Sequence, residues 1–271
     1  MIEYLAPAIV AIATAAAAYT DYKTGYIYDW ITYPLIAIGI GLRLWSQDWM
    51  GLGLGIAVFA VLYAFYWTGK LGGGDVKLFT GMAFVLPFYQ KQIFLLNVLF
   101  FAALSALLFY ALYYLYKLWK DKIPIKAEGT QRNTAILLAI FALVFSGLLV
   151  YNNTVSVWVG AGLVLVFLIA SVYVAAEKTI KEHYFLKQIA IDELEEDEII
   201  ATEFMDAATL EKSGLNLKKI IGEAEKQKLR QLGIAHVPVY RDAPRFGPFI
   251  FVGTVLALCA PQFFAVLFLS V

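Results

Sequence analysis

Three aspartates stand out because they lie at the edges of long apolar runs. They are Asp21, Asp29 and Asp75, whereas 14 of the 21 acidic residues fall within residues 177–245. A carboxylate at a membrane boundary is costly, so each is a candidate functional residue. Two carboxylates held close together share a proton. The charged one can then activate a water against a peptide carbonyl, while the protonated one polarises that carbonyl. The residue types therefore predict the chemistry of an aspartic protease, which needs no metal and no cofactor.

Asp75 follows three consecutive glycines, Gly72, Gly73 and Gly74, and is itself followed by Val76 and Lys77. Glycines at a helix start are unfavourable for local order, but they let the backbone turn sharply and approach another segment closely. An aspartate at the head of a helix is also a good N-cap. Capping explains the aspartate but not the glycines, so the combination favours a functional site.

Asp21 closes the first apolar run, two residues before Lys23. The order of the apolar runs predicts that Asp21 and Asp75 reach the same face of the membrane, where they would titrate as a unit. Lys23 and Lys77 are candidates for tuning these carboxylates. The preference for lysine at cytoplasmic helix ends predicts lysines there as well.

The chain as a whole has the composition of a membrane protein. Of its 271 residues 61% are hydrophobic and 15% are charged, against roughly 25% charged in a soluble domain. A membrane helix needs about 20 apolar residues, and the run 2–20, which lacks a basic leader, reads as a retained helix. The predicted spans are 2–20, 31–45, 51–68, 76–90, 93–116, 134–151, 155–176 and 248–270.

These patterns predict an all-α polytopic membrane protein of about six to eight transmembrane helices. We expect a helical body over residues 1–176 that carries the catalytic loops, a small hydrophilic α+β insert over 177–247, and a last membrane helix over 248–271. Within the insert, strands are expected at 184–191 and 237–240, and a helix is expected to run from Asn216 to about Leu232.

The connection 117–132 carries four lysines and an arginine, whereas 151–154 carries no basic residue. The first should therefore be cytoplasmic and the second external. This orientation places the three aspartates and the insert on the cytoplasmic side of the plasma membrane. No basic stripe with interleaved aromatics points to nucleic acid, so lipid and a protein substrate are the expected partners.

The chain resembles a known family at these same residues. Asp21-x-Lys23 after the first span and Gly72-x-Gly74-Asp75-x-Lys77 after the third are similar to the archaeal preflagellin and prepilin peptidases, which belong with the type IV prepilin peptidases among the Gly-x-Gly-Asp membrane aspartic proteases. The resemblance implies that Asp21 and Asp75 are catalytic. It also implies that the protein removes the short basic leader, the class III signal peptide, from type IV pilin or archaellin precursors on the cytoplasmic side.

Several alternatives stay open at this point. Tyr28-Asp29 is similar to the Tyr-Asp of presenilin-like proteases, so Asp29 is an alternative catalytic partner of Asp75. An ion-coupled transporter would place its acids near mid-membrane, and a non-catalytic platform of a pilus or archaellum would not need paired aspartates. The single Cys259 cannot build the paired-cysteine zinc motif of bacterial relatives that also methylate. We therefore expect peptidase activity without methyltransferase activity.

Overall fold

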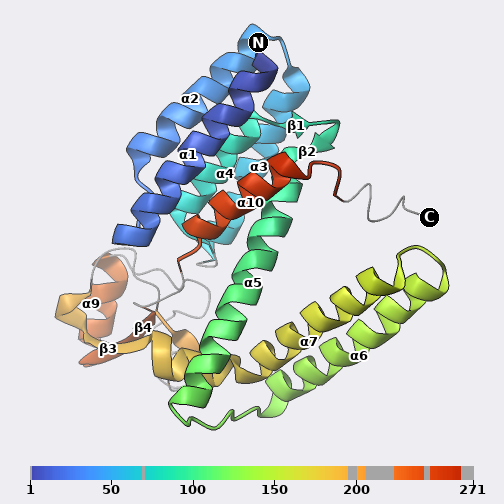
Figure 1. The fold of residues 1–271 in the computed structure, drawn as a ribbon. Helices are drawn as coiled ribbons and strands as arrows, with labels where there is room; N and C mark the ends of the chain where they lie inside the picture. Colours follow the sequence, from blue (N-terminus) through green and yellow to red (C-terminus); the bar gives the residue numbers. More distant parts are fainter. Residues whose placement is uncertain (1, 69–70, 195–199, 206–222, 241–244, 264–271) are drawn as a thin grey trace.

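The computed structural model describes residues 2–68, 71–194, 200–205, 223–240 and 245–263 (Figure 1). The helices are α1 (Ile2–Thr24), α2 (Asp29–Trp45), α3 (Trp49–Trp67), α4 (Gly73–Val85), α5 (Phe94–Lys120), α6 (Gly129–Tyr151), α7 (Val157–Ile180), α9 (Glu223–Gln231) and α10 (Gly247–Cys259). The strands are β1 (Phe88–Tyr89), β2 (Gln92–Ile93), β3 (Leu186–Ala190) and β4 (His236–Tyr240).

Each predicted span corresponds to one of the apolar helices, which confirms the expected all-α membrane fold with a small sheet in its insert. Five helical segments of the described chain are long and apolar enough to cross a membrane: Leu5–Thr24, Trp49–Trp67, Phe94–Lys120, Gly129–Tyr151 and Val157–Phe185. The protein is therefore a multi-pass membrane protein.

Helix α4 is the buried centre of the body. Residues 76–85 are buried except for Lys77, and α4 packs against α1, α2, α3 and α5. Two glycines let its neighbours approach closely at its far end. A Cβ on Gly39 of α2 would lie 2.5 Å from Phe84 Cβ, and one on Gly55 of α3 would lie 2.2 Å from the Phe84 ring. Helices α2 and α3 are thus drawn together around Phe84, at the end of α4 remote from Asp75.

One of the predicted spans was too long. The helix expected over 76–90 ends at Val85, and residues 88–93 form the antiparallel hairpin β1–β2. The reason is Pro87, because the residue before a proline is disfavoured in the helical conformation. Within the last span, expected over 248–270, α10 ends at Cys259, shortly before Pro261, and residues 264–270 lie outside the described residues.

Helix α10 returns from the end of the chain to the N-terminal body, where it packs against α1 and α5 (Figure 1). The contact with α5 is close, since a Cβ on Gly253 would lie 2.6 Å from the carbonyl oxygen of Val98. The buried Asn97 of α5 also donates a hydrogen bond to the carbonyl of Pro261, at 3.1 Å. The first and last apolar helices are therefore neighbours, and the start of α10 comes to the end of α1.

The α6–α7 hairpin and the insert lie beside this body (Figure 1). The expected strands of the insert are confirmed as β3 and β4, which pair antiparallel over a small core that includes Ile189, Val237 and Leu229 of α9. The helix expected from Asn216 is described only from Glu223 onward, and Asn216 itself lies outside the described residues. A second cluster, which includes Leu118, Ile180 and Phe185, joins the ends of α5 and α7, with Tyr240 of β4 packed against it.

Candidate active site

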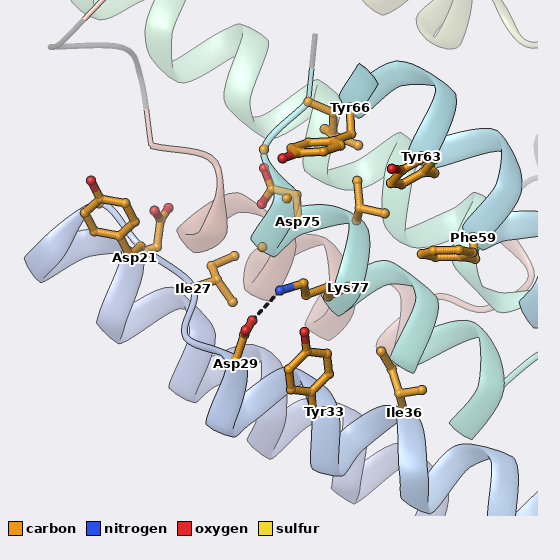
Figure 2. Close-up of a pocket in the computed structure, with 17 residues that line it drawn as sticks. Asp21, Ile27, Asp29, Tyr33, Ile36, Phe59, Tyr63, Tyr66, Asp75 and Lys77 are labelled. Carbon is orange, nitrogen blue, oxygen red and sulfur yellow. Dashed lines mark hydrogen bonds and ion pairs between the residues drawn. The ribbon is translucent and has the colours of Figure 1, made fainter. Parts of the chain in front are cut away.

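A pocket of about 630 Å³ lies where α1 ends and α2 and α4 begin (Figure 2). Its mouth carries the three aspartates singled out in the sequence, Asp21, Asp29 and Asp75, together with Lys77. One wall of the pocket is formed by aromatic side chains of α3. The lining residues are Asp21, Gly25, Tyr26, Ile27, Asp29, Tyr33, Ile36, Phe59, Tyr63, Tyr66 and residues 71–77.

Asp75 lies in the first turn of α4, and the glycines before it allow the helix to begin in close contact with neighbouring segments. A Cβ on Gly74 would lie 2.9 Å from Ile27 Cβ and 3.0 Å from the Ile27 carbonyl oxygen, so only glycine lets α4 start against this loop. A Cβ on Gly73 would lie 3.3 Å from the Tyr66 ring, and one on Gly72 would lie 3.2 Å from Asp75 Oδ2. The three glycines thus seat the Asp75 carboxyl group between the Ile27 loop and Tyr66.

Asp21 is held from the other end of the chain. Its side chain is buried, and its Oδ2 accepts a hydrogen bond of 2.7 Å from the backbone N–H of Gly247, the first residue of α10. A Cβ on Gly247 would lie 2.8 Å from both Asp21 Cβ and Oδ2, so this contact also requires glycine. The preceding turn is fixed by Tyr110 of α5, whose hydroxyl donates to the carbonyl of Arg245 at 2.7 Å.

Asp21 and Asp75 lie on the same pocket, and the Asp21 charge acts on the Asp75 carboxyl group. No hydrogen bond joins their side chains among the interactions of the described chain, and they stand apart in Figure 2. Two carboxyl groups placed in this way resist ionising together, so the arrangement favours a state in which one of them is protonated.

Asp29 has a different environment from the other two. Its Oδ1 forms an ion pair of 2.6 Å with Lys77 Nζ, drawn as a dashed line in Figure 2. The Lys77 ammonium group also lies 4.8 Å from the centre of the Tyr33 ring. The ammonium group of Lys77 therefore interacts with both Asp29 and Tyr33. Lys23 is exposed and does not line the pocket, and its ammonium group lies 5.2 Å from the centre of the Tyr19 ring on its own helix.

Sequence reasoning missed two parts of this site. Gly247 lies 226 residues from Asp21, and the only signal for it was the Gly-Pro pair that opens the last apolar run. The aromatic residues Phe59, Tyr63 and Tyr66 follow a spacing of four and three on α3. That spacing places them on one face of a helix. In an apolar span such residues read equally well as lipid-facing.

No group of three or more His, Cys, Asp or Glu side chains in the described part of the chain is arranged to hold a metal ion. The pocket therefore offers a pair of carboxyl groups, a third acid neutralised by lysine, and an aromatic wall. This donor set fits acid–base chemistry on a bound peptide.

The comparisons with known proteins point to the same region. Residues 8–113 match the type IV leader peptidase family, and this stretch contains most of α1, all of α2 to α4 and most of α5. The chain is also 33% identical over 101 residues to a prepilin peptidase, EppA, of Methanothermobacter thermautotrophicus. That alignment covers 34% of this chain and 26% of the relative, so the chain matches about a quarter of the relative's length. No solved structure matches the chain.

The family match contains both Asp21 and Asp75, and both comparisons concern peptidases of this type. The resemblance drawn from the aspartates and glycines is thereby confirmed for the N-terminal body. This multi-pass membrane protein is similar to the type IV leader peptidases over residues 8–113, and over 101 residues it is similar to a prepilin peptidase.

Proposed function

We propose that this protein is a membrane aspartic endopeptidase that removes the short basic leader from type IV pilin-like or archaellin precursors. The observation that carries the proposal is that Asp21 of α1 and Asp75 of α4 line the same pocket. This pocket lies within the region that matches leader peptidases. Their mutual repulsion and burial favour a state with one charged and one protonated carboxyl group, which is the state that such a mechanism requires.

The reaction follows from that state. The charged carboxyl group takes a proton from a water held between the two aspartates, and the oxygen of that water attacks the scissile carbonyl. The protonated carboxyl group polarises the same carbonyl and then donates its proton to the leaving amine. The pair titrates as a unit, so neither aspartate is assigned one fixed role. The products are a free leader and a mature protein with a new amino terminus.

Asp29 is the less suitable partner for Asp75. Its carboxylate is paired with Lys77 at 2.6 Å, so its Oδ1 is already engaged in an ion pair. We propose that this ion pair instead ties the start of α2 to α4 beside the site. The orientation of the basic connection 117–132 supports cleavage on the cytoplasmic side.

The direct test is cleavage of a purified precursor with a class III leader by the purified protein in detergent. Mass spectrometry of the products should show a single cut between the basic leader and the apolar segment, and Asp75→Asn should abolish it. An intact precursor after incubation with folded wild-type protein would contradict the proposal. Full cleavage by Asp75→Asn would contradict the assigned site.

A further inference from the structure

The aromatic wall of the pocket has no part in the acid–base chemistry and still lines the same cavity as the aspartates. Phe59, Tyr63 and Tyr66 of α3 form a continuous ladder, with ring centres 5.6 Å apart for Phe59 and Tyr63 and 5.8 Å apart for Tyr63 and Tyr66. Figure 2 shows the wall on one side of Asp75 and Lys77, facing Tyr33 and Ile36 of α2.

The groove between α2 and α3 changes character along its length. Its mouth is charged, with Asp21, Asp29, Asp75 and Lys77. The lining side chains farther along α2 and α3 are uncharged and mostly aromatic or aliphatic. Helix α4 forms its floor, and the two walls are drawn together beyond it around Phe84. An occupant of the groove should therefore be polar at one end and apolar along the rest.

Large parts of these aromatic side chains are uncovered. Phe59 is 44% exposed, Tyr63 50% and Tyr33 54%. The hydroxyls of Tyr63 and Tyr66 make no hydrogen bond within the described part of the chain. In a membrane, segments associate through close packing and through hydrogen bonds that lipid cannot supply. Phenol rings offer both of these to a peptide.

A peptide bond in an intact helix cannot be cleaved, so a substrate must unwind beside Asp21 and Asp75. Its freed backbone N–H and C=O groups then need partners at a depth where water is scarce. The hydroxyls of Tyr63 and Tyr66 lie on the same pocket as Asp75 and could supply such partners. The aromatic ring of Phe59, farther along α3, can pack against side chains of the segment that remains helical.

We infer that the groove between α2 and α3, walled by Phe59, Tyr63 and Tyr66, binds the apolar segment of the substrate immediately after the scissile bond. This inference rests on the proposed function and specifies it further. The basic leader lies at the acidic mouth, and the apolar segment enters the groove from the membrane along α3. The aromatic ladder thus determines which precursors are accepted.

The test uses α3 itself as its control. Phe65 is of the same residue type, lies on the same helix and is 47% exposed, but it does not line the pocket. The photoreactive amino acid p-benzoylphenylalanine is placed at position 59 or 65 of the inactive Asp75→Asn protein, which is then irradiated with a full-length precursor. Position 59 should crosslink to the apolar segment of the precursor, and position 65 should crosslink to detergent or lipid.

A kinetic measurement complements the crosslink. Phe59→Ala in the otherwise wild-type protein should raise KM for the precursor about tenfold or more, because a buried aromatic contact carries much of the binding energy of an interface. Phe65→Ala should leave KM unchanged, and both variants should keep kcat within about threefold of wild type.

Three results would overturn the inference: a crosslink from position 59 to the leader, equal crosslinks to the precursor from both positions, or adducts of position 59 with lipid alone. Cleavage by the wild-type protein distinguishes a failure of the groove assignment from a failure of the proposed function. If the wild-type protein cleaves and position 59 fails to reach the apolar segment, only the groove assignment is wrong. If the wild-type protein does not cleave, both the function and the groove assignment are wrong.

Discussion

At the scale of single residues, the site depends on a contact between the two ends of the chain. Asp21 is oriented by the N–H of Gly247 rather than by a neighbour in sequence. A hydrogen bond to a charged group stabilises it by about 1.5–3 kcal/mol. A carboxyl group without this bond would be free to rotate away from the pocket, so we treat Gly247 as a positioning residue.

Gly247→Ala should therefore lower the rate of precursor cleavage about tenfold to a hundredfold, as expected from the loss of 1.5–3 kcal/mol. The added Cβ would lie 2.8 Å from Asp21 and force the two helices apart. The rate is measured as kcat, and folding is checked by thermal unfolding in detergent. Gly147→Ala in α6 is the control, since no atom lies within 4 Å of a Cβ there. Wild-type kcat in Gly247→Ala would contradict the positioning role.

The same reasoning applies to the glycine that precedes Asp75. Gly74→Ala would place a Cβ 2.9 Å from Ile27 Cβ and 3.0 Å from the Ile27 carbonyl. Because overpacking of this kind costs about 1–3 kcal/mol, the variant should unfold at a lower temperature and should lose most of its cleavage activity. Gly53→Ala on α3, where a Cβ meets open space, should do neither. Equal behaviour of the two variants would show that the contact with Ile27 is not tight.

At the scale of elements, α3 is fixed at the end far from the aspartates. Asp48 caps α3 by accepting a hydrogen bond of 2.8 Å from the Gly51 N–H, and it pairs with Arg43 of α2 at 2.8 Å. Arg43 also donates to the carbonyl of Val85, at the end of α4. Arg43 thus connects the end of α2 to the start of α3 and the end of α4.

The hydrogen bond from Gly51 and then the contact with Arg43 lower the pKa of Asp48 below its usual range. A carboxyl group whose pKa is lower in the folded protein stabilises that state above its unfolded pKa of about 3.9 and loses the contribution as the pH falls through the folded value. Asp48→Ala should therefore lower stability by about 1 kcal/mol at pH 7, with a smaller difference from wild type below about pH 4. Thermal unfolding in detergent at both values measures this. A difference that does not shrink in acid would contradict the role of the charge.

At the scale of the whole molecule, every element of the site lies at one end of the helical body, on the side of the insert. The end of α1 and the starts of α2, α4 and α10 meet there (Figure 1). The basic connection 117–132 follows α5 toward the same side, and this arrangement supports a cytoplasmic site. The orientation is open to a direct measurement.

Single cysteines at the exposed positions Lys126 and Asn152, introduced into a Cys259→Ser background, should label oppositely with a membrane-impermeant maleimide. Position 152, in the turn between α6 and α7, should react in intact cells. Position 126 should react only after lysis, because the basic connection is expected in the cytoplasm. Labelling of position 126 in intact cells would reverse the proposed orientation.

Much of this architecture could be predicted from the sequence, because membrane helices appear in it as long apolar runs. The glycines before Asp75 also indicate a close approach of the backbone to another segment. The early end of α4 was also encoded, in Pro87, but the apolar run continues past it. The partner of Asp21 could not be predicted, since a backbone N–H leaves no side-chain signature. The ladder of Phe59, Tyr63 and Tyr66 could not be assigned either, because lipid-facing and pocket-facing aromatics look alike in an apolar span.

The central claim is that Asp21 and Asp75 act as one catalytic unit, and cleavage rates of the single and double Asn variants test it most directly. Each single variant should lower kcat by about a thousandfold or more, and the double variant should be no slower than the worse single variant, as expected for residues that act together. Asp29→Asn, whose parent carboxylate is paired with Lys77, should stay within about threefold of wild type. Loss of cleavage in Asp29→Asn with activity retained in Asp21→Asn would contradict the account and move the site to Asp29 and Asp75.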